Sequence, residues 1–456
     1  MSFHFQIFSA HKICLTLLLT IAVTGNLSCN LSANASDVSY LEVQEKNKVA
    51  LENAQLNIEK VRKNNARIKI LDTNGKPLNN LRIKIRQISH DFKFGCYLKI
   101  DDLETEKLPV YENRFSRLFN FAIIGNYWDF IENKENAEDW TWFDRELSLA
   151  QKLNLRTQTA PILWGTNQAG TPSWLPKNKE KLQTILKSRI ENALNKAELV
   201  DEYEVVNEPL AKNKDFFAQV VGTDYVETAF RQARELKPNK RLMLNEYGVF
   251  GELKSHNYNR EKYFLLIKDL ISKNVPIDII GLQAHANGEW FEPANVAEQL
   301  EKYATLGKPI QITEFSSQTL EFDDRKTPLK ISGLYQRGTW TAEKQAEFYR
   351  EFYTIAFGNS QVEAIVTWGL DDERAWLPGI GLIDGFNNPK PSYEMLERLI
   401  NKDWKTSVDG FSNALGIYDF RGFYGKYEVD FFFKGKKKTR EFELRKDRNN
   451  EWVITL

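Results

Sequence analysis

Eight short apolar runs lie between residues 92 and 401, and helical patterns follow them. The runs are 4 to 7 residues long, which suits strands that are buried on both faces. Strict alternation of strand and helix produces parallel pairing, and eight such units close into a (β/α)8 TIM barrel rather than an open sheet. The predicted strands are Phe92–Tyr97, Phe121–Ile124, Arg156–Ile162, Glu202–Val206, Arg241–Leu244, Ile279–Leu282, Pro309–Thr313 and Ala364–Thr367.

Two further segments flank the predicted barrel. Residues 40–65 carry a helical pattern, and the alternating runs Ala66–Leu71 and Leu81–Ile88 around the turn Asp72–Gly75 predict a β-hairpin. After the barrel, short alternating runs predict antiparallel strands, with a basic turn at Lys434–Arg440. The sequence therefore predicts a helix and hairpin appendage at 36–90, a barrel domain at 91–402 and a C-terminal β-rich segment at 403–456.

The first 35 residues have the features of an export signal. An apolar run at residues 13–23 follows basic residues and is too short to span a membrane. A small-residue Ala-Asn-Ala motif ends at Ala35, so we expect cleavage there, removal of residues 1–35 and secretion. Lipid attachment at Cys29 is a competing route, but Asn26 stands where a bacterial lipoprotein signal usually has leucine.

Charge and aromatic content limit the classes of partner. The chain has 62 basic and 62 acidic residues, so its net charge gives no reason to expect nucleic acid as a partner. The 11 Trp, 17 Tyr and 29 Phe residues suit a carbohydrate site, because the flat C–H faces of sugars stack on aromatic rings, although most of these residues must fill the core. We expect a monomer with a polysaccharide substrate and no stable membrane span.

Polar and aromatic residues stand at the C-terminal ends of the predicted strands, the rim where a TIM barrel carries its chemistry. Two of them are glutamates, Glu208 after the fourth strand and Glu314 after the seventh. The other residues that we take as candidates for substrate binding are Asn126, Trp164, Asn207, Asn245, Tyr247, Gln283, His285, Trp368 and Trp376. Glu246 also ends a strand, as a loop carboxylate or a supporting partner.

A pair of carboxyl groups across one cleft is the equipment of a glycosidase. Acetal cleavage needs one protonated carboxyl for the leaving oxygen and one ionised carboxylate beside the developing positive charge. We assign Glu208 as the acid and base and Glu314 as the nucleophile, with His285 as a donor that holds Glu314 ionised. Asn207 can donate to the 2-hydroxyl of the reacting sugar. Each residue alone has a structural explanation, and the ordered set carries the prediction.

With these motifs, the chain resembles glycoside hydrolase family 10, the endo-β-1,4-xylanases, over residues 92–399. The resemblance implies a (β/α)8 barrel, a retaining double displacement on β-1,4-xylan and no metal or organic cofactor. It assigns the same roles to Glu208 and Glu314 and places Asn207, Gln283, His285, Trp368 and Trp376 at sugar-binding or supporting positions. The matching runs are Glu204–Pro209, Leu244–Tyr247, Ile280–His285, Ile312–Glu314, Thr171–Leu175, Trp368-Gly369 and Asn388–Tyr393.

Two departures from the family pattern affect the predicted sugar site. After the second strand the family usually reads Glu-Asn-x-x-Lys, but only Asn126 of the run Gly125–Asp129 matches. After the third strand the family reads Arg-Gly-His and then Trp-His, where this chain has Arg156–Gln158 and then Trp164-Gly165. A lysine and two histidines expected to hold the glycone sugars are therefore missing, and each lost charge-assisted hydrogen bond is worth about 1.5–3 kcal/mol.

These losses leave the substrate as the least constrained part of the prediction. One alternative is a related barrel glycosidase that cleaves β-glucan or mannan. Another is a catalytically degenerate barrel that only binds carbohydrate. The intact pair Glu208 and Glu314 favours an enzyme over a binding protein.

Overall fold

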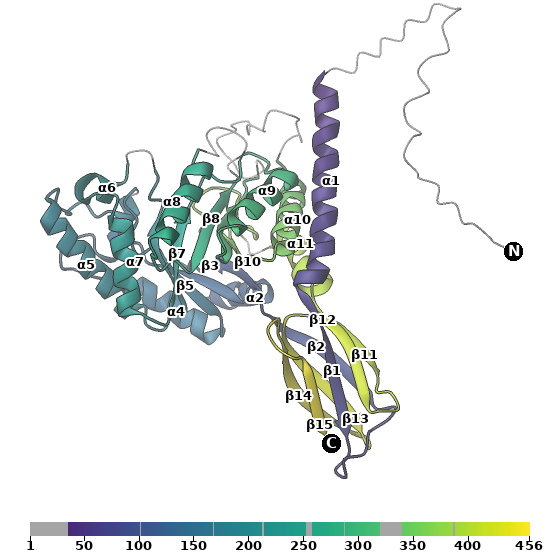
Figure 1. The fold of residues 1–456 in the computed structure, drawn as a ribbon. Coiled ribbons are helices and arrows are strands. Elements are labelled where there is room, and N and C mark those ends of the chain that lie inside the picture. The colour runs from purple at the N-terminus through teal and green to yellow at the C-terminus, as the bar shows by residue number, and fades with distance from the viewer. Residues whose placement is uncertain are drawn as a thin grey trace, which may run out of the picture.

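The structure is a computed structural model that describes residues 35–100, 102–166, 168–211, 214–251, 258–286, 288–319, 340–385 and 388–456. A barrel surrounded by helices forms the larger part, and a β-sandwich lies beneath it (Figure 1). A long helix, α1 (Ala35–Val61), runs along one side of the barrel and leads directly into the sandwich. The predicted signal peptide falls outside the described residues apart from Ala35, where α1 begins.

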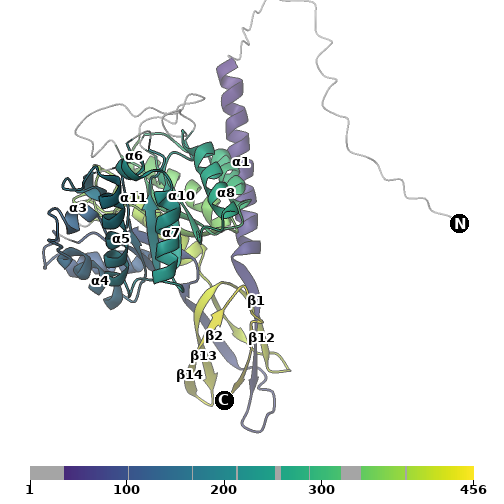
Figure 2. The same cartoon turned by 60° about the vertical axis from the view of Figure 1, so that its left-hand side comes forward.

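The barrel is closed, with strand order β10-β3-β4-β5-β6-β7-β8-β9 and parallel pairing throughout, which confirms the predicted fold. Helices cover its outer surface, as Figure 2 shows. The strands are β3 (Lys93–Tyr97), β4 (Phe121–Gly125), β5 (Arg156–Ala160), β6 (Glu202–Asn207), β7 (Arg241–Glu246), β8 (Ile279–His285), β9 (Ile310–Ser316) and β10 (Val362–Thr367). The helices are α2 (Leu108–Leu118), α3 (Trp128–Ile131), α4 (Thr141–Lys152), α5 (Lys179–Lys196), α6 (Phe216–Val221), α7 (Tyr225–Leu236), α8 (Arg260–Ser272), α9 (Pro293–Ala304), α10 (Ala342–Gly358) and α11 (Pro391–Arg398).

The two flanking segments, which the sequence analysis treated separately, form one β-sandwich. Its first sheet has the order β12-β1-β15 and its second the order β11-β2-β13-β14, and apolar residues from both sheets share one core. We expected antiparallel strands after the barrel, but β15 pairs with β1 in parallel. The strands are β1 (Lys63–Leu71), β2 (Arg82–His90), β11 (Ser407–Phe411), β12 (Ile417–Phe423), β13 (Gly425–Phe433), β14 (Lys436–Leu444) and β15 (Glu451–Thr455).

The predicted hairpin of β1 and β2 is wrong, because these strands belong to opposite sheets. The turn at Asp72 does form, since its carboxylate accepts from the backbone N–H groups of Asn74 and Lys76 at 2.9 and 2.8 Å. The chain folds back only briefly, since the Leu78 N–H donates to the Ile70 carbonyl at 2.9 Å, and it then enters the other sheet with β2. The predicted basic turn is also too long, because β14 already begins at Lys436.

Helix α1 is fastened to the barrel between α9 and α10. Ala54 and Ile58 are buried in the barrel core, and a Cβ atom on Gly358 of α10 would lie 2.7 Å from the Ala54 carbonyl oxygen. The side chain of Asn47 donates to Glu292 at 2.7 Å, just before α9. Among the described residues, no helix combines the length and the apolar character needed to cross a membrane.

Five polar residues at the N-terminal ends of the strands close the floor of the barrel. Glu363 accepts from Lys93 at 3.0 Å, from Arg241 at 2.6 and 3.0 Å and from Gln311 at 2.9 Å. Glu202 binds the same three partners. Burial opposes ionisation of Glu363, but the charges of Lys93 and Arg241 outweigh it and lower its pKa to about 2.

We expect Glu363→Gln to destabilise the protein by about 3 kcal/mol at pH 7, because a lowered native-state pKa stabilises a fold above the unfolded pKa. That stabilisation is lost as the pH falls from about 4.5 towards 2, so the difference from wild type should shrink to about 1 kcal/mol near pH 2.5. Urea unfolding of both proteins at the two pH values measures this difference. A difference that is independent of pH would contradict the electrostatic explanation.

Candidate active site

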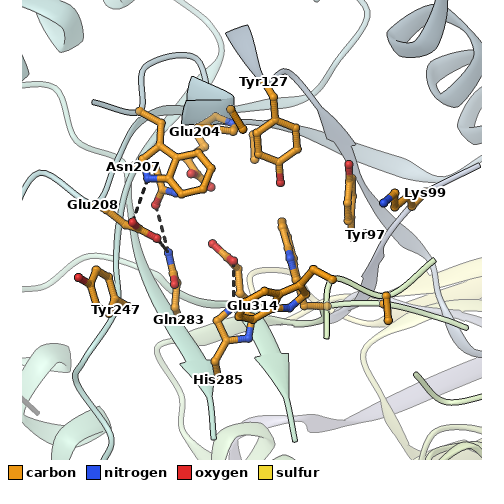
Figure 3. Close-up of a pocket in the computed structure, with 18 of the residues that line it drawn as sticks. Tyr97, Lys99, Tyr127, Glu204, Asn207, Glu208, Tyr247, Gln283, His285 and Glu314 are labelled. Carbon is orange, nitrogen blue, oxygen red and sulfur yellow. Dashed lines mark hydrogen bonds and ion pairs between the residues drawn. The ribbon is translucent and has the colours of Figure 1, made fainter. Parts of the chain in front are cut away.

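A cavity of about 910 Å³ opens at the C-terminal ends of the barrel strands. Figure 3 shows Glu208 and Glu314 facing this space from different strands. Seven of the other residues predicted from the strand ends also line the cavity: Trp164, Asn207, Tyr247, Gln283, His285, Trp368 and Trp376. The strand-end rule therefore locates most of the site.

Glu208 follows β6 directly, in a left-handed backbone conformation with φ of 53°. Such a φ is uncommon outside glycine and persists where surrounding bonds enforce it. Its N–H donates to the Asn245 carbonyl at 2.9 Å. The side chain accepts from Gln283 at 3.0 Å on one oxygen, and from Trp164 at 2.9 Å and Thr166 at 3.1 Å on the other. Its carboxyl group is therefore fixed by donors from three directions.

Glu314 lies within β9 and is held from both sides. One oxygen accepts from Asn245 Nδ2 at 3.0 Å, and the other lies 3.0 Å from His285 Nε2. An ionised carboxylate can only accept, so the second bond requires a proton on Nε2 of His285. Nδ1 of His285 lies 2.7 Å from Ser316 Oγ, which fixes the ring. Glu314 therefore has one hydrogen-bond partner on each carboxylate oxygen.

Glu208 has surroundings that favour the protonated form. Burial raises the pKa of Glu208, the negative charge of Glu314 raises it further, and the three donors oppose these effects. Glu204, an inward-facing residue of β6, has a pKa well above its ordinary value for the same two reasons. A carboxyl with a raised pKa, beside a second carboxylate that has a hydrogen-bond partner on each oxygen, is the contrast that acid-assisted acetal cleavage needs.

Two predicted binding residues lie outside the cavity lining. Asn245 is fully buried behind Glu314, where it donates to that carboxylate and accepts from Thr313 at 2.7 Å. Asn126 is also buried, with its oxygen 2.6 Å from the guanidinium of Arg189. The prediction that Asn126 binds substrate is not supported by this placement, because the side chain is committed to an interior hydrogen bond.

Glu246 is a structural carboxyl. It is fully buried, and burial raises its pKa well above the ordinary value. It accepts from the backbone N–H groups of Leu210 and Tyr247 and from the side chain of Asn259, at 2.9 to 3.0 Å. These bonds tie the loop that follows Glu208 to the end of β7.

Several cavity residues were missed by the sequence analysis. Tyr97 stacks on Trp368 with ring centroids 4.8 Å apart, and Tyr127 stacks on Trp142 at 5.9 Å. Tyr97 ends β3 and Tyr127 follows β4 by two residues, so a strand-end search of those two strands would have found them. Trp142 stands in α4 and gave no such signal. Four further charged residues of the lining were also missed: Lys99, Glu204, Asp371 and Arg374. Thr166, which donates to Glu208, was missed as well.

The structure explains the missing histidine after Trp164. A Cβ atom on Gly165 would lie 2.0 Å from a carboxylate oxygen of Asp215, so the backbone there accepts no side chain unless Asp215 moves. Thr166 follows and donates to Glu208 instead. Gln158 occupies the position of the other missing histidine. It is buried in the barrel interior, with its amide nitrogen 3.8 Å from the Met243 sulfur.

The family model described as Glycosyl hydrolase family 10 matches residues 85–398, which includes every barrel strand and both glutamates. The chain belongs to glycosyl hydrolase family 10. It is an O-glycosyl hydrolase of the endo-1,4-β-xylanase-like kind. Endo-1,4-beta-xylanase B of Thermotoga neapolitana is 29% identical to it over 304 residues, which cover 63% of this chain and 83% of that protein.

Two further relatives agree with this family 10 membership. Endo-1,4-beta-xylanase 1 of Arabidopsis thaliana is 24% identical over 403 residues, 87% of this chain and 39% of that protein, so this match extends beyond the barrel. The crystal structure of an endo-1,4-beta-xylanase from Caldicellulosiruptor owensensis has a TM-score of 0.55 at 26% identity, covering 67% of this chain and 96% of that one. Among the described residues of this family 10 enzyme, we find no group of three or more metal-ligating side chains.

Removal of the Thr166 hydroxyl should shift the pH dependence of this family 10 enzyme. In Thr166→Val the charged form of Glu208 loses one donor, so its pKa rises further and the alkaline limb of kcat/KM moves up by about one pH unit. Thr166→Ser keeps the hydroxyl and serves as the control. A shift of the limb to lower pH, or equal profiles for the two variants, would contradict this role.

Proposed function

We propose that this family 10 enzyme is a secreted, retaining endo-β-1,4-xylanase, with Glu208 as the general acid and base and Glu314 as the nucleophile. The observation that carries the proposal is the contrast between the two carboxyls. Burial and the neighbouring charge raise the pKa of Glu208, whereas Glu314 accepts from Asn245 and lies within hydrogen-bond distance of His285. A carboxylate pair of this kind supplies both groups that retaining glycoside hydrolysis requires.

In the first step, the Glu208 carboxyl gives its proton to the glycosidic oxygen as the bond from that oxygen to the anomeric carbon breaks. A Glu314 oxygen attacks the same carbon from the opposite face and forms a glycosyl ester. Asn245 and His285 orient Glu314 for this attack. The leaving chain departs with the proton as its new hydroxyl group, and Glu208 is left ionised.

In the second step, ionised Glu208 takes a proton from water, and the water oxygen attacks the anomeric carbon. The ester bond to Glu314 breaks, which regenerates the Glu314 carboxylate and a protonated Glu208. Two inversions at one carbon give net retention of configuration. Gln283 donates to both Glu208 and Asn207, at 3.0 and 3.2 Å, and so couples the acid to a neighbouring sugar-binding position.

The substrate and stereochemistry are tested together by incubating the enzyme with linear β-1,4-xylan, β-1,4-glucan and β-1,4-mannan. We expect xylo-oligosaccharides of several lengths early in the reaction, with the β-anomer appearing first by NMR. Products from glucan or mannan but not xylan would overturn the substrate assignment. An initial α-anomer would overturn the retaining mechanism. Saturable binding without products would identify a degenerate binding protein.

Export is supported by the apolar run at residues 13–23 and the small-residue motif before Ser36. Expression of the full chain in a bacterial host should release a protein that begins at Ser36, which N-terminal sequencing and intact mass would identify. A fatty-acylated Cys29 at the mature terminus would support the competing lipid-anchored route instead.

A further inference from the structure

A lysine ammonium stands in the active-site cavity at a position that the catalytic steps do not use. Lys99 follows β3 by two residues, lines the cavity and is partly exposed. Figure 3 places it beside Tyr97, across the cavity from Glu208 and Tyr247. The family lysine expected after the second strand is absent, so Lys99 supplies a positive charge to the cavity from a different strand.

The other cation in the cavity lining is already neutralised. Arg374 binds Asp371 at 2.9 Å, Glu373 at 3.3 Å and Asp102 at 3.2 Å. Among the residues that the structure describes, the Lys99 ammonium takes part in no hydrogen bond or ion pair. The pKa of Glu208 is raised by burial and by the charge of Glu314, and no cation contributes to this shift. Of the two basic residues, lysine or arginine, that line the cavity, only Lys99 has no acidic partner among the described residues.

We propose that Lys99 binds the carboxylate of a uronic acid substituent on the substrate, and that this enzyme prefers acid-decorated xylan over neutral xylan. An ammonium in a partly desolvated cavity gains most from an acceptor that carries a full negative charge, because charge-assisted hydrogen bonds are about twice as strong as neutral ones. The cavity of about 910 Å³ has room for a branched sugar as well as the main chain. This inference rests on the proposed xylanase function.

The geometry also assigns the decorated side of the scissile bond. The leaving chain lies towards the proton donor, Glu208, and the sugar that is attacked lies against Glu314. Lys99 and Tyr97 stand at the end of the cavity away from Glu208 (Figure 3). The uronate that Lys99 binds therefore belongs to the glycone, and it remains on the product that carries the new reducing end.

The test compares three matched oligosaccharides: linear xylohexaose, xylohexaose with one glucuronic acid branch, and the same branched compound with its carboxyl reduced to an alcohol. Wild type should have a higher kcat/KM on the acidic compound than on the carboxyl-reduced one. In Lys99→Met the ratio of these two values should fall by about 10- to 100-fold, because one charge-assisted bond is lost. Lys99→Arg should keep most of the ratio, and added salt should lower it in wild type.

Lys107 offers a matched control, because it lies outside the cavity lining and pairs with Glu104 and Glu373. Lys107→Met removes a positive charge from the same region and should leave the ratio at its wild-type value. Equal wild-type rates on the acidic and reduced compounds would overturn the proposal. An equal loss of kcat/KM on all three compounds in Lys99→Met would also overturn it, because Lys99 would then donate a hydrogen bond to a sugar hydroxyl that all three share. Recovery of the uronate on the leaving-chain product would also overturn it. Failure of wild type to cleave even xylohexaose would instead refute the proposed function.

Discussion

With Glu314 replaced by alanine, kcat/KM on xylan should fall by about 10⁵-fold, equivalent to about 7 kcal/mol of transition-state stabilisation. The variant loses the oxygen that forms the glycosyl ester and the negative charge beside the developing oxocarbenium ion. Asn245 Nδ2 and His285 Nε2 would then face an empty site. Initial rates on xylan and on an aryl xylobioside measure the loss, and both substrates should be affected.

Chemical rescue separates a lost nucleophile from a damaged fold. Azide can enter the space left by the Glu314 side chain and attack the anomeric carbon once, so the Glu314→Ala variant should form an α-glycosyl azide from an aryl β-xylobioside. Glu314→Gln keeps the shape of the side chain and should bind xylo-oligosaccharide while remaining inactive. Wild-type turnover by Glu314→Ala, or a β-configured azide product, would remove Glu314 from the role of nucleophile.

The barrel could be predicted from sequence because its pattern is local and repeated. Each strand is a short apolar run with a helix after it, and the ends of parallel strands meet at one rim whatever the loops do. Glu208, Gln283 and Glu314 were therefore placed in one site from three distant segments. The structure extends β6, β7, β8 and β9 further than predicted, so the polar residues at those ends belong to the strands themselves.

The sandwich shows where local pattern was insufficient. The alternation in β1 and β2 is correct, but alternation identifies only which face of a strand is buried and not which strand it pairs with. The partners of β1 are β12 and β15, more than 300 residues away in the chain. A turn signal at Asp72 is compatible with a hairpin and with a crossing between sheets, so sequence alone could not choose.

The direction of single side chains was the other limit. Asn126 stands at a strand end and matches the family pattern, yet it turns to Arg189 and leaves the cavity to its neighbour Tyr127. Lys99 lies two residues beyond β3, where loop geometry decides whether a side chain enters the cavity. Rim residues could be predicted as a set, whereas their individual orientation depends on loops that have no periodic signal.

With Glu208 replaced by alanine, the loss should depend on the leaving group. On xylan, whose leaving oxygen needs a proton, kcat should fall by about 10³- to 10⁴-fold. On an aryl xylobioside with an activated phenolate, ester formation needs little acid assistance, so the ester should accumulate and kcat and KM should fall together. Azide should accelerate turnover and give a β-glycosyl azide. Equal losses on both substrates would contradict the assignment of Glu208 as the acid and base.

The surroundings of Glu208 also determine how activity and stability depend on pH. Because burial and the charge of Glu314 raise the pKa of Glu208, wild-type kcat/KM on xylan should decline as the pH rises through that raised value, and the alkaline limb should be absent in Glu208→Ala. Glu208 affects the pH dependence of stability in the opposite direction to Glu363, because the pKa of Glu208 is raised and that of Glu363 is lowered. The native state holds this proton more tightly than the unfolded state, so wild type loses stability as the pH rises from the ordinary carboxyl range to the raised pKa.

The isosteric variant Glu208→Gln cannot ionise, and it should therefore gain stability relative to wild type as the pH rises above the ordinary carboxyl range. Thermal midpoints of the two proteins at several pH values measure this trend, which does not depend on any constant offset caused by the new amide. A midpoint difference that stays fixed across the range would mean that folding leaves the proton affinity of Glu208 unchanged. The acid role would then lack its physical basis, because a carboxyl with an ordinary pKa is ionised at the pH where a proton must be delivered.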